Sequence, residues 1–311
     1  MKAKIYISFL IVSLLSVAGF GQKFNKYCLY ADYATTAYNK GKISEAIALM
    51  DSAITNCSDQ NNTFENWFNL SMFYKQLAKE TKDPKEKDKY RKEAFTTIIT
   101  ARELDEEGNY TKNINGVIKS IANYYYNDAV IKLDDTSSNF VEAVELYNEY
   151  KKVYSAIGNV DFKEKDILFY TVLGQRNSTK YENNKQLYKQ YLDSAVASYK
   201  KVLEIDSNLA DIHMKIGILY FNEAIDLVNA LDPDADWDVA IKADERKAEL
   251  ALLSIPHFKK VLESDPDNTK ALYSLAGCYE LLTLKDEVRH YLTLLKEKDP
   301  EFYNDVYKTN P

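Results

Sequence analysis

The chain has 311 residues, 46% of them hydrophobic and 28% charged, which is ordinary globular composition with enough apolar surface for a core. Forty lysines and arginines against 47 acids leave a net charge of −7, which disfavours nucleic acid as a partner. The lysines are interspersed with acids, so no basic patch for a membrane surface stands out. Nine glycines and six prolines leave few sharp turns, as long helices require.

The first 21 residues have the layout of a secretory signal peptide. A positively charged start precedes an apolar run over residues 5–17, and Gly19 and Gly21 are the small residues expected before a cleavage site. We therefore expect an exported chain in the periplasm or cell envelope, with no stable membrane insertion after cleavage. An uncleaved anchor is the alternative, although the run is short for a span of about 20 residues.

The mature part, residues 22–311, contains a series of helical hairpins, in which apolar stripes at the helical period are separated by polar turns. In the first turn, Gly41 suits the left-handed conformation that ends a helix. The second hairpin contains an extra charged stretch from Lys79 to Arg91, which we expect to form longer, solvated helix ends. The expected hairpins cover residues 24–57, 62–106, 110–157, 161–207, 209–266 and 267–300, with a tail or cap over 301–311.

The last hairpin shows the pattern best, because it lies between two prolines 34 residues apart, Pro266 and Pro300. Its first helix carries one apolar stripe at the spacing i, i+3, i+4, i+7, formed by Leu272, Leu275, Ala276 and Tyr279. Pro300 ends the second helix, since proline has no amide hydrogen to donate. Another proline, Pro256, falls inside the second helix of the fifth hairpin, where we expect a kink or a helix start.

This period and these residues resemble the tetratricopeptide repeat, whose signature is Trp-x2-Leu-Gly-x2-Tyr, then Ala-x3-Phe, then Pro. Trp67, Leu70 and Tyr74 match three of the first four positions, and Ser71 replaces Gly with another small residue. The resemblance covers all six hairpins. It implies an all-α fold, a right-handed α-α superhelix (solenoid) of about six antiparallel helical hairpins in one domain.

In that family the first helices of the hairpins line a concave face that takes an extended peptide or a partner helix. The resemblance implies that the partner-binding positions here are Tyr38, Phe68, Asn69, Met72, Lys75, Lys119, Asn123 and Tyr273. Aromatic rings and the thioether offer apolar contact, while amide and amine groups can hold a peptide backbone or carboxylate. The alternative is that these residues cover a packed surface.

The sequence contains no catalytic motif: no Gly-rich phosphate loop, no Gly-x-Ser-x-Gly and no His-Glu-x-x-His. His213, His257 and His290 lack the spacing of metal ligands, and we expect each on a helix surface. Four alternating aspartates at 232–238 lack the Gly and distal Glu of a calcium loop. We expect a solvated acidic loop there, with Trp237 tucked onto the repeat. No metal and no cofactor are predicted.

The cysteines suggest one disulfide. Cys28 and Cys57 are near opposite ends of the first hairpin, and their midpoint, (28 + 57)/2 = 42.5, falls beside its turn. An antiparallel hairpin therefore makes them neighbours, and export provides an oxidising compartment. The alternative is three unpaired small hydrophobic residues. We expect Cys278 to be a buried free thiol.

Together these features predict a non-enzymatic scaffold that binds a protein or peptide partner, within an envelope or secretion assembly. An exported carbohydrate- or small-ligand-binding protein, which would use a tyrosine-rich groove on the concave face, is the alternative from another class. An enzyme ranks third. An open groove favours a peptide, whereas a closed aromatic pocket favours a small ligand.

Overall fold

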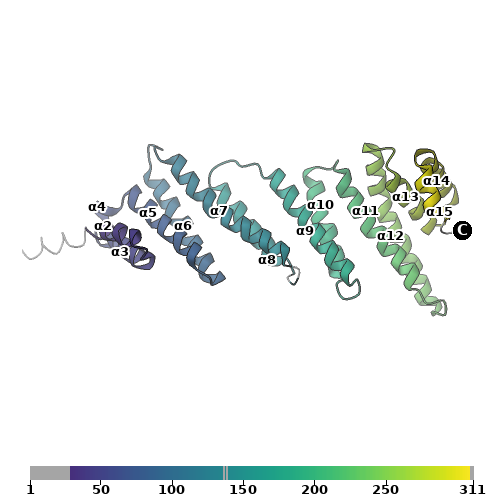
Figure 1. Cartoon of the computed structure of the whole chain (residues 1–311), viewed down its shortest axis with the longest axis horizontal. Coiled ribbons are helices and arrows are strands. Elements are labelled where there is room, and N and C mark those ends of the chain that lie inside the picture. Colours follow the sequence, from purple (N-terminus) through teal and green to yellow (C-terminus); the bar gives the residue numbers. More distant parts are fainter. Residues whose placement is uncertain (1–28, 136, 138, 309–311) are drawn as a thin grey trace, which may run out of the picture. The chain divides into compact units, whose positions relative to one another are not determined.

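The computed structural model describes residues 29–135, 137 and 139–308, and every regular element in these ranges is an α-helix (Figure 1). The all-α class is therefore confirmed for the described part of the chain. The signal-like segment 1–21 and Cys28 lie outside the described residues. The chain divides into two compact units, of which unit 1 is residues 1–132 with 141–160 and unit 2 is residues 133–140 with 161–311.

Unit 1 is built from helices that pair through short turns (Figure 1). They are α2 (Tyr30–Asn39), α3 (Ile43–Asn56), the short α4 (Ser58–Asn61), α5 (Phe64–Glu80), α6 (Pro84–Leu104), α7 (Thr111–Asp134) and α8 (Val141–Ser155). Gly41 has a φ of +74° in the turn between α2 and α3, as its position predicts. Asp83 caps α6, since its carboxylate accepts hydrogen bonds from the amides of Lys85 and Glu86, both 2.9 Å long.

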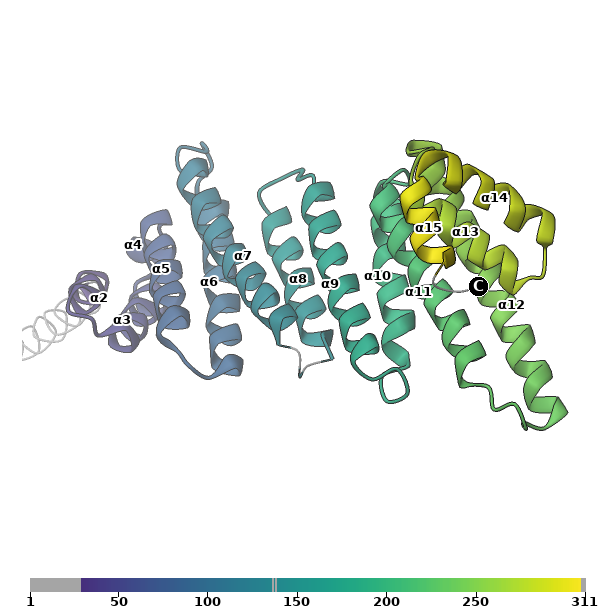
Figure 2. The same ribbon diagram turned by 45° about the vertical axis from the view of Figure 1, so that its right-hand side comes forward.

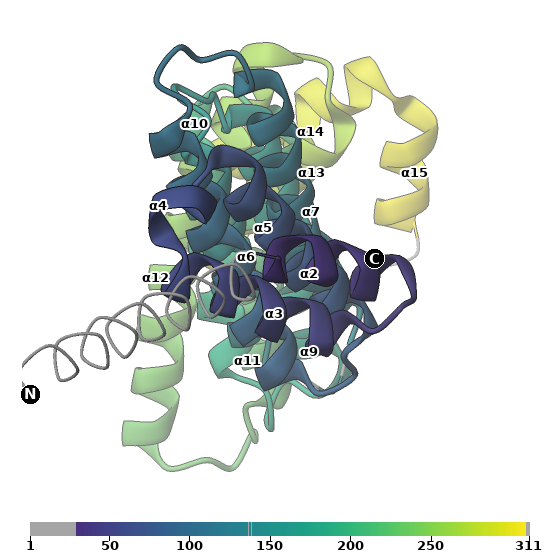
Figure 3. The same cartoon turned by 90° about the vertical axis from the view of Figure 1, so that its left-hand side faces the viewer.

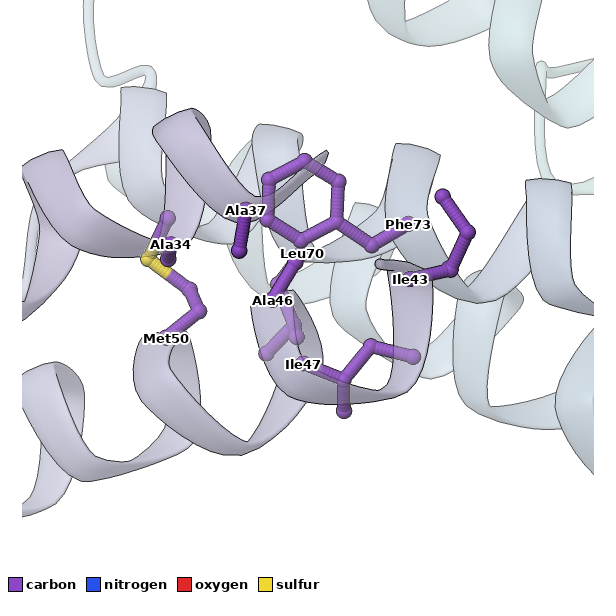
Figure 4. Packing of buried hydrophobic residues seen from close by; sticks show 8 residues of the cluster. All are labelled: Ala34, Ala37, Ile43, Ala46, Ile47, Met50, Leu70 and Phe73. Carbon is purple, nitrogen blue, oxygen red and sulfur yellow. The ribbon is translucent and has the colours of Figure 1, made fainter. Parts of the chain in front are cut away.

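Small side chains let the first helices of unit 1 pack closely (Figure 4). Ala34 of α2 and Ala46 of α3 are completely buried, and Met50 fills the space beside Ala34. Leu70 and Phe73 extend the same core cluster into α5. A single hairpin cannot bury its own apolar faces, so this shared cluster joins the first hairpin to the second.

Unit 2 continues the same architecture. Its helices are α9 (Lys163–Asn183), α10 (Gln190–Ile205), α11 (Ala210–Ala230), α12 (Trp237–Ser264), α13 (Thr269–Leu281), α14 (Lys285–Lys298) and α15 (Pro300–Lys308). Pro300 separates α14 from α15, and Asp299 caps α15 by accepting the amide hydrogen of Phe302 at 2.9 Å. The segment expected as a tail or cap after Pro300 thus begins as a helix.

Two glycines set the distance between paired helices in unit 2. A Cβ atom on Gly174 of α9 would lie 2.5 Å from the ring of Tyr199 on α10. One on Gly217 of α11 would lie 2.7 Å from the ring of Phe258 on α12. The small residue of the repeat pattern is therefore needed because an aromatic ring of the second helix lies directly against it.

Helix α12 is twice as long as α14, with 28 residues against 14. It continues through Pro256, so this proline neither starts nor ends a helix. Its buried residues all lie in the second half, from Leu250 to Val261. The first half extends beyond the ends of α13 and α14 and contacts the end of α11 there (Figures 2 and 3).

Candidate functional site

The surface expected to bind a partner in unit 1 is centred on α5. Phe68, Met72 and Lys75 follow the spacing i, i+4, i+7, which places them on one stripe of the helix, and all three are half-buried. The ring of Phe64, one turn earlier, lies 5.4 Å from that of Phe68 and stacks at 4.1 Å on Tyr110. Because Tyr110 immediately precedes α7, the starts of α5 and α7 lie side by side.

The remaining expected positions in this region are polar. Lys119 and Asn123 are exposed one turn apart on α7, and Asn69 is half-buried beside Phe68 on α5. Burial lowers the pKa of the Lys75 amine, and the neighbouring cation Lys79 lowers it further. An anionic group of a partner next to this amine would stabilise its charged form and so raise the lowered pKa of Lys75. We define the α5–α7 surface as Phe68, Asn69, Met72, Lys75, Lys119 and Asn123.

Tyr38 and Tyr273 have different surroundings from these six residues. The ring of Tyr38 stacks on the buried Phe73 at 4.5 Å, so Tyr38 closes the edge of the first core cluster. Tyr273 belongs to unit 2, where its ring meets the edge of Phe302 from α15 at 5.8 Å. Tyr38 therefore packs at the edge of a core cluster, whereas Tyr273 is 37% exposed beside α15.

Arg91 is an exception to the expected solvation of the stretch 79–91, in which residues 79–90 are exposed or half-buried. Only 6% of this residue is exposed. Its guanidinium pairs with Asp128 of α7 at 2.8 Å and lies over the ring of Tyr125 at 5.0 Å. The burial of Arg91 could have been predicted from the sequence, because Arg91 falls on the same helical stripe as Ala94, Ile98 and Ala101. Those three residues are completely buried.

The Arg91 cluster lines a cleft of about 870 Å³ between α6, α7 and α8. Several of its charged groups are paired. Lys92 lies 2.7 Å from Asp88, and Lys132 lies 2.7 Å from Glu142. Tyr125 donates a hydrogen bond to Asp88 at 3.0 Å. Because these charges neutralise one another, we interpret the cluster as a link between α6, α7 and α8.

Two histidines also lie where the sequence did not place them. His213 is 9% exposed, and its Nδ1 lies 2.9 Å from Nδ1 of His257. Its Nε2 lies 3.0 Å from the carbonyl oxygen of Ser207 and donates to it. Burial lowers the pKa of His257 to about 4, assisted by the charges of His213 and Lys200. The His257 ring is therefore neutral near pH 7, and a hydrogen bond joins it to His213.

Neither the histidine pair nor the acidic loop forms a metal site of three or more His, Cys, Asp or Glu residues in the part of the chain that the structure describes. The expectation that Trp237 is tucked onto the repeat is wrong, since 79% of this residue is exposed. Sequence periodicity could not reveal the exposure of Trp237, because it identifies a face of a helix and not what covers that face.

Cys278 is completely buried, and burial raises the pKa of its thiol to about 12, in agreement with the expected buried thiol. Cys57 is also buried. Because Cys28 is outside the described residues, the disulfide stays a prediction. None of the described helices is both long enough and apolar enough to cross a membrane.

Comparison with known proteins identifies the type of repeat. Residues 187–223, which include α10 and the first part of α11, match the model of the TPR (tetratricopeptide) repeat. No curated protein matches the chain significantly.

Solved structures that the chain resembles include PilF of Pseudomonas aeruginosa, at 11% identity over 93% of this chain and 100% of that one, with a TM-score of 0.34. The C-terminal part of a TPR repeat-containing protein of Cytophaga hutchinsonii is 16% identical over 97% and 98%, with a TM-score of 0.28. The TPR2AB domain of yeast Sti1, solved as a pHSP90 complex, is 13% identical over 93% and 95%, with a TM-score of 0.29. Residues 187–223 of this chain therefore resemble a TPR repeat, and the helices before and after them also form helical hairpins.

Proposed function

We propose that this protein is a non-enzymatic scaffold that binds an extended peptide or a partner helix on its α5–α7 surface. The observation that carries the proposal is the stack of Phe64 on Tyr110, which brings the starts of α5 and α7 together. Helices α5 and α7, the first helices of two consecutive hairpins, can thereby contact the same partner through the residues of the α5–α7 surface. The repeat match supports this use, because stacked helical repeats form extended binding surfaces.

The chemistry of the α5–α7 surface suits a peptide with apolar side chains and a carboxylate. Phe68 and Met72 are half-buried, so a partner that covers them removes further apolar surface from water. Lys75 and Lys119 supply positive charge, while Asn69 and Asn123 can donate to and accept from a peptide backbone. We place this scaffold in the periplasm or cell envelope on the strength of the signal-like residues 1–21.

Capture of partners from an envelope extract tests the proposal. The mature chain, residues 22–311, serves as bait beside the double variant Phe68→Ala/Met72→Ala. Leu187→Ala is the matched control, because Leu187 is an exposed apolar residue of unit 2. We expect a protein or peptide that binds the wild type and the control and is lost from the double variant. Equal capture by all three baits, or capture of a glycan alone, contradicts the proposal.

A further inference from the structure

The connection between α11 and α12 forms an unusually apolar projection. We define the α11–α12 tip as residues 227–247, which comprise the end of α11, the loop and the first turns of α12. Not one residue between 225 and 249 is buried. A solvated tip is normally polar, yet five large apolar residues here are between 36% and 79% exposed, namely Val228, Leu231, Trp237, Val239 and Ile241.

Four of these five residues, all except Val239, line a cleft of about 480 Å³. Leu227, Val228 and Leu231 form its wall on α11, while Trp237, Ala240 and Ile241 form the wall on α12. The volume is within the range of about 300–1,000 Å³ found for ligand pockets. With most of its indole in water, Trp237 offers the type of side chain that contributes most to protein interfaces.

The rim of this cleft is acidic. Residues 232–249 contain seven acids against three bases, a net charge of −4. Two of the three bases are already paired within α12, Arg246 with Glu249 and Lys247 with Asp244. Asp234, Asp236 and Asp238 remain exposed on the loop and the start of α12. The tip thus combines an apolar cleft with a negative border.

We propose that the α11–α12 tip docks a basic amphipathic helix of another protein. Apolar side chains of that helix enter the cleft against Trp237, and its lysines or arginines meet the aspartates of the rim. A second copy of this chain is a poor occupant, because two tips repel each other, each with six acids and three bases in residues 227–247 and a net charge of −3. An anionic membrane surface is repelled for the same reason. The proposal is independent of the α5–α7 surface.

Fluorescence of Trp237 tests the interaction in the mature chain. The chain has two tryptophans, so Trp67→Phe leaves Trp237 as the only reporter. The probe is a synthetic peptide of about 18 leucines and lysines with leucine on one helical face, compared with the same peptide carrying glutamate for lysine. We expect a saturable blue shift with the lysine peptide only. Binding should weaken about tenfold in the triple variant Asp234→Asn/Asp236→Asn/Asp238→Asn.

Anisotropy of a labelled lysine peptide supplies a second measurement. Trp237→Ala should weaken binding about tenfold or more, whereas Leu252→Ser should leave it unchanged. Leu252 is the matched control because it is 60% exposed on the same helix but outside the tip. Circular dichroism verifies that each variant is folded, which we expect because both side chains are exposed.

Several outcomes overturn the proposal. One is equal binding of the lysine and glutamate peptides, and another is unchanged binding to Trp237→Ala. A blue shift with phosphatidylcholine vesicles but not with the lysine peptide would assign the tip to a lipid surface. A dimer in sedimentation that Trp237→Ala abolishes would assign it to self-association.

Discussion

Gly174 illustrates how a single residue sets the separation of two helices. Its Cα faces the ring of Tyr199, which is buried and therefore cannot move away easily. We expect Gly174→Ala to lower the free energy of unfolding by about 1–3 kcal/mol, because overpacking outweighs the better helix propensity of alanine. Calorimetric melting of the purified variant measures the change.

Gly116 is the control for this prediction. It lies within α7, and a Cβ atom there meets no other heavy atom within 4 Å. Gly116→Ala should therefore stabilise the protein by about 0.5–1 kcal/mol, since only the helix propensity changes. A loss of stability in Gly116→Ala similar to that in Gly174→Ala would contradict the packing explanation.

His257 makes the stability of the protein depend on pH. Its pKa is about 4 in the folded protein, against about 6.5 for an ordinary histidine, so between these values the unfolded chain binds more protons. Its contribution to stability is complete above about pH 6.5 and is lost as the pH falls toward 4. We expect the melting temperature to fall between about pH 7.5 and about pH 5, and to fall less in His257→Gln.

His290→Gln provides the comparison for that measurement, because His290 is exposed on α14. Its pH dependence of melting should match that of the wild type. If His257→Gln and His290→Gln respond equally, the histidine pair is not the source of the effect.

At the scale of helices, a residue of α2 packed in the core can be compared with a residue of α5 that we propose to bind a partner. Tyr38 of α2 stacks on Phe73 in the core, so Tyr38→Ala should cost about 1–3 kcal/mol of stability. Phe68→Ala on α5 should cost less, because Phe68 is only half-buried and its ring meets that of Phe64 at a tilt. Urea denaturation of the two variants gives the ranking, and an equal or larger loss for Phe68→Ala would place Phe68 in the core.

The first hairpin carries the untested prediction of a disulfide. A bridge between Cys28 and Cys57 would tie the open end of the terminal repeat, which has a neighbour on one side only. For a loop of about 30 residues, the chain-entropy model gives a stabilisation of about 3–4 kcal/mol. Mass spectrometry of exported protein without reductant should find one thiol, at Cys278, and a count of three would reject the bridge.

For the molecule as a whole, the sequence predicted the class of fold well because that information is local. Apolar stripes at the helical period, Gly41 in its turn and Asp83 before Pro84 each act within a few residues of themselves. The helices α2, α3 and α6 accordingly begin or end where those signals lie.

The pairs that the sequence missed join distant residues. Arg91 and Asp128 are on different helices, as are His213 and His257, and no periodicity connects such positions. The exposure of Trp237 was missed for a similar reason. This residue lies in the first part of α12, where the helix has no buried residue. The candidate site was therefore predictable as a set of helix faces, but not as a set of contacts.

The uneven burial along α12 also has a kinetic consequence. Residues 237–249 have no buried side chain, whereas all buried residues of α12 lie between Leu250 and Val261. The two parts of this continuous helix should therefore differ in the protection of their amide hydrogens against exchange. Amide hydrogens of the first half should exchange with deuterium well before those of the second half. The loop around Ala235 is consequently a suitable place to insert a fluorescent or affinity tag, because opening there leaves the hairpin stack of unit 2 intact.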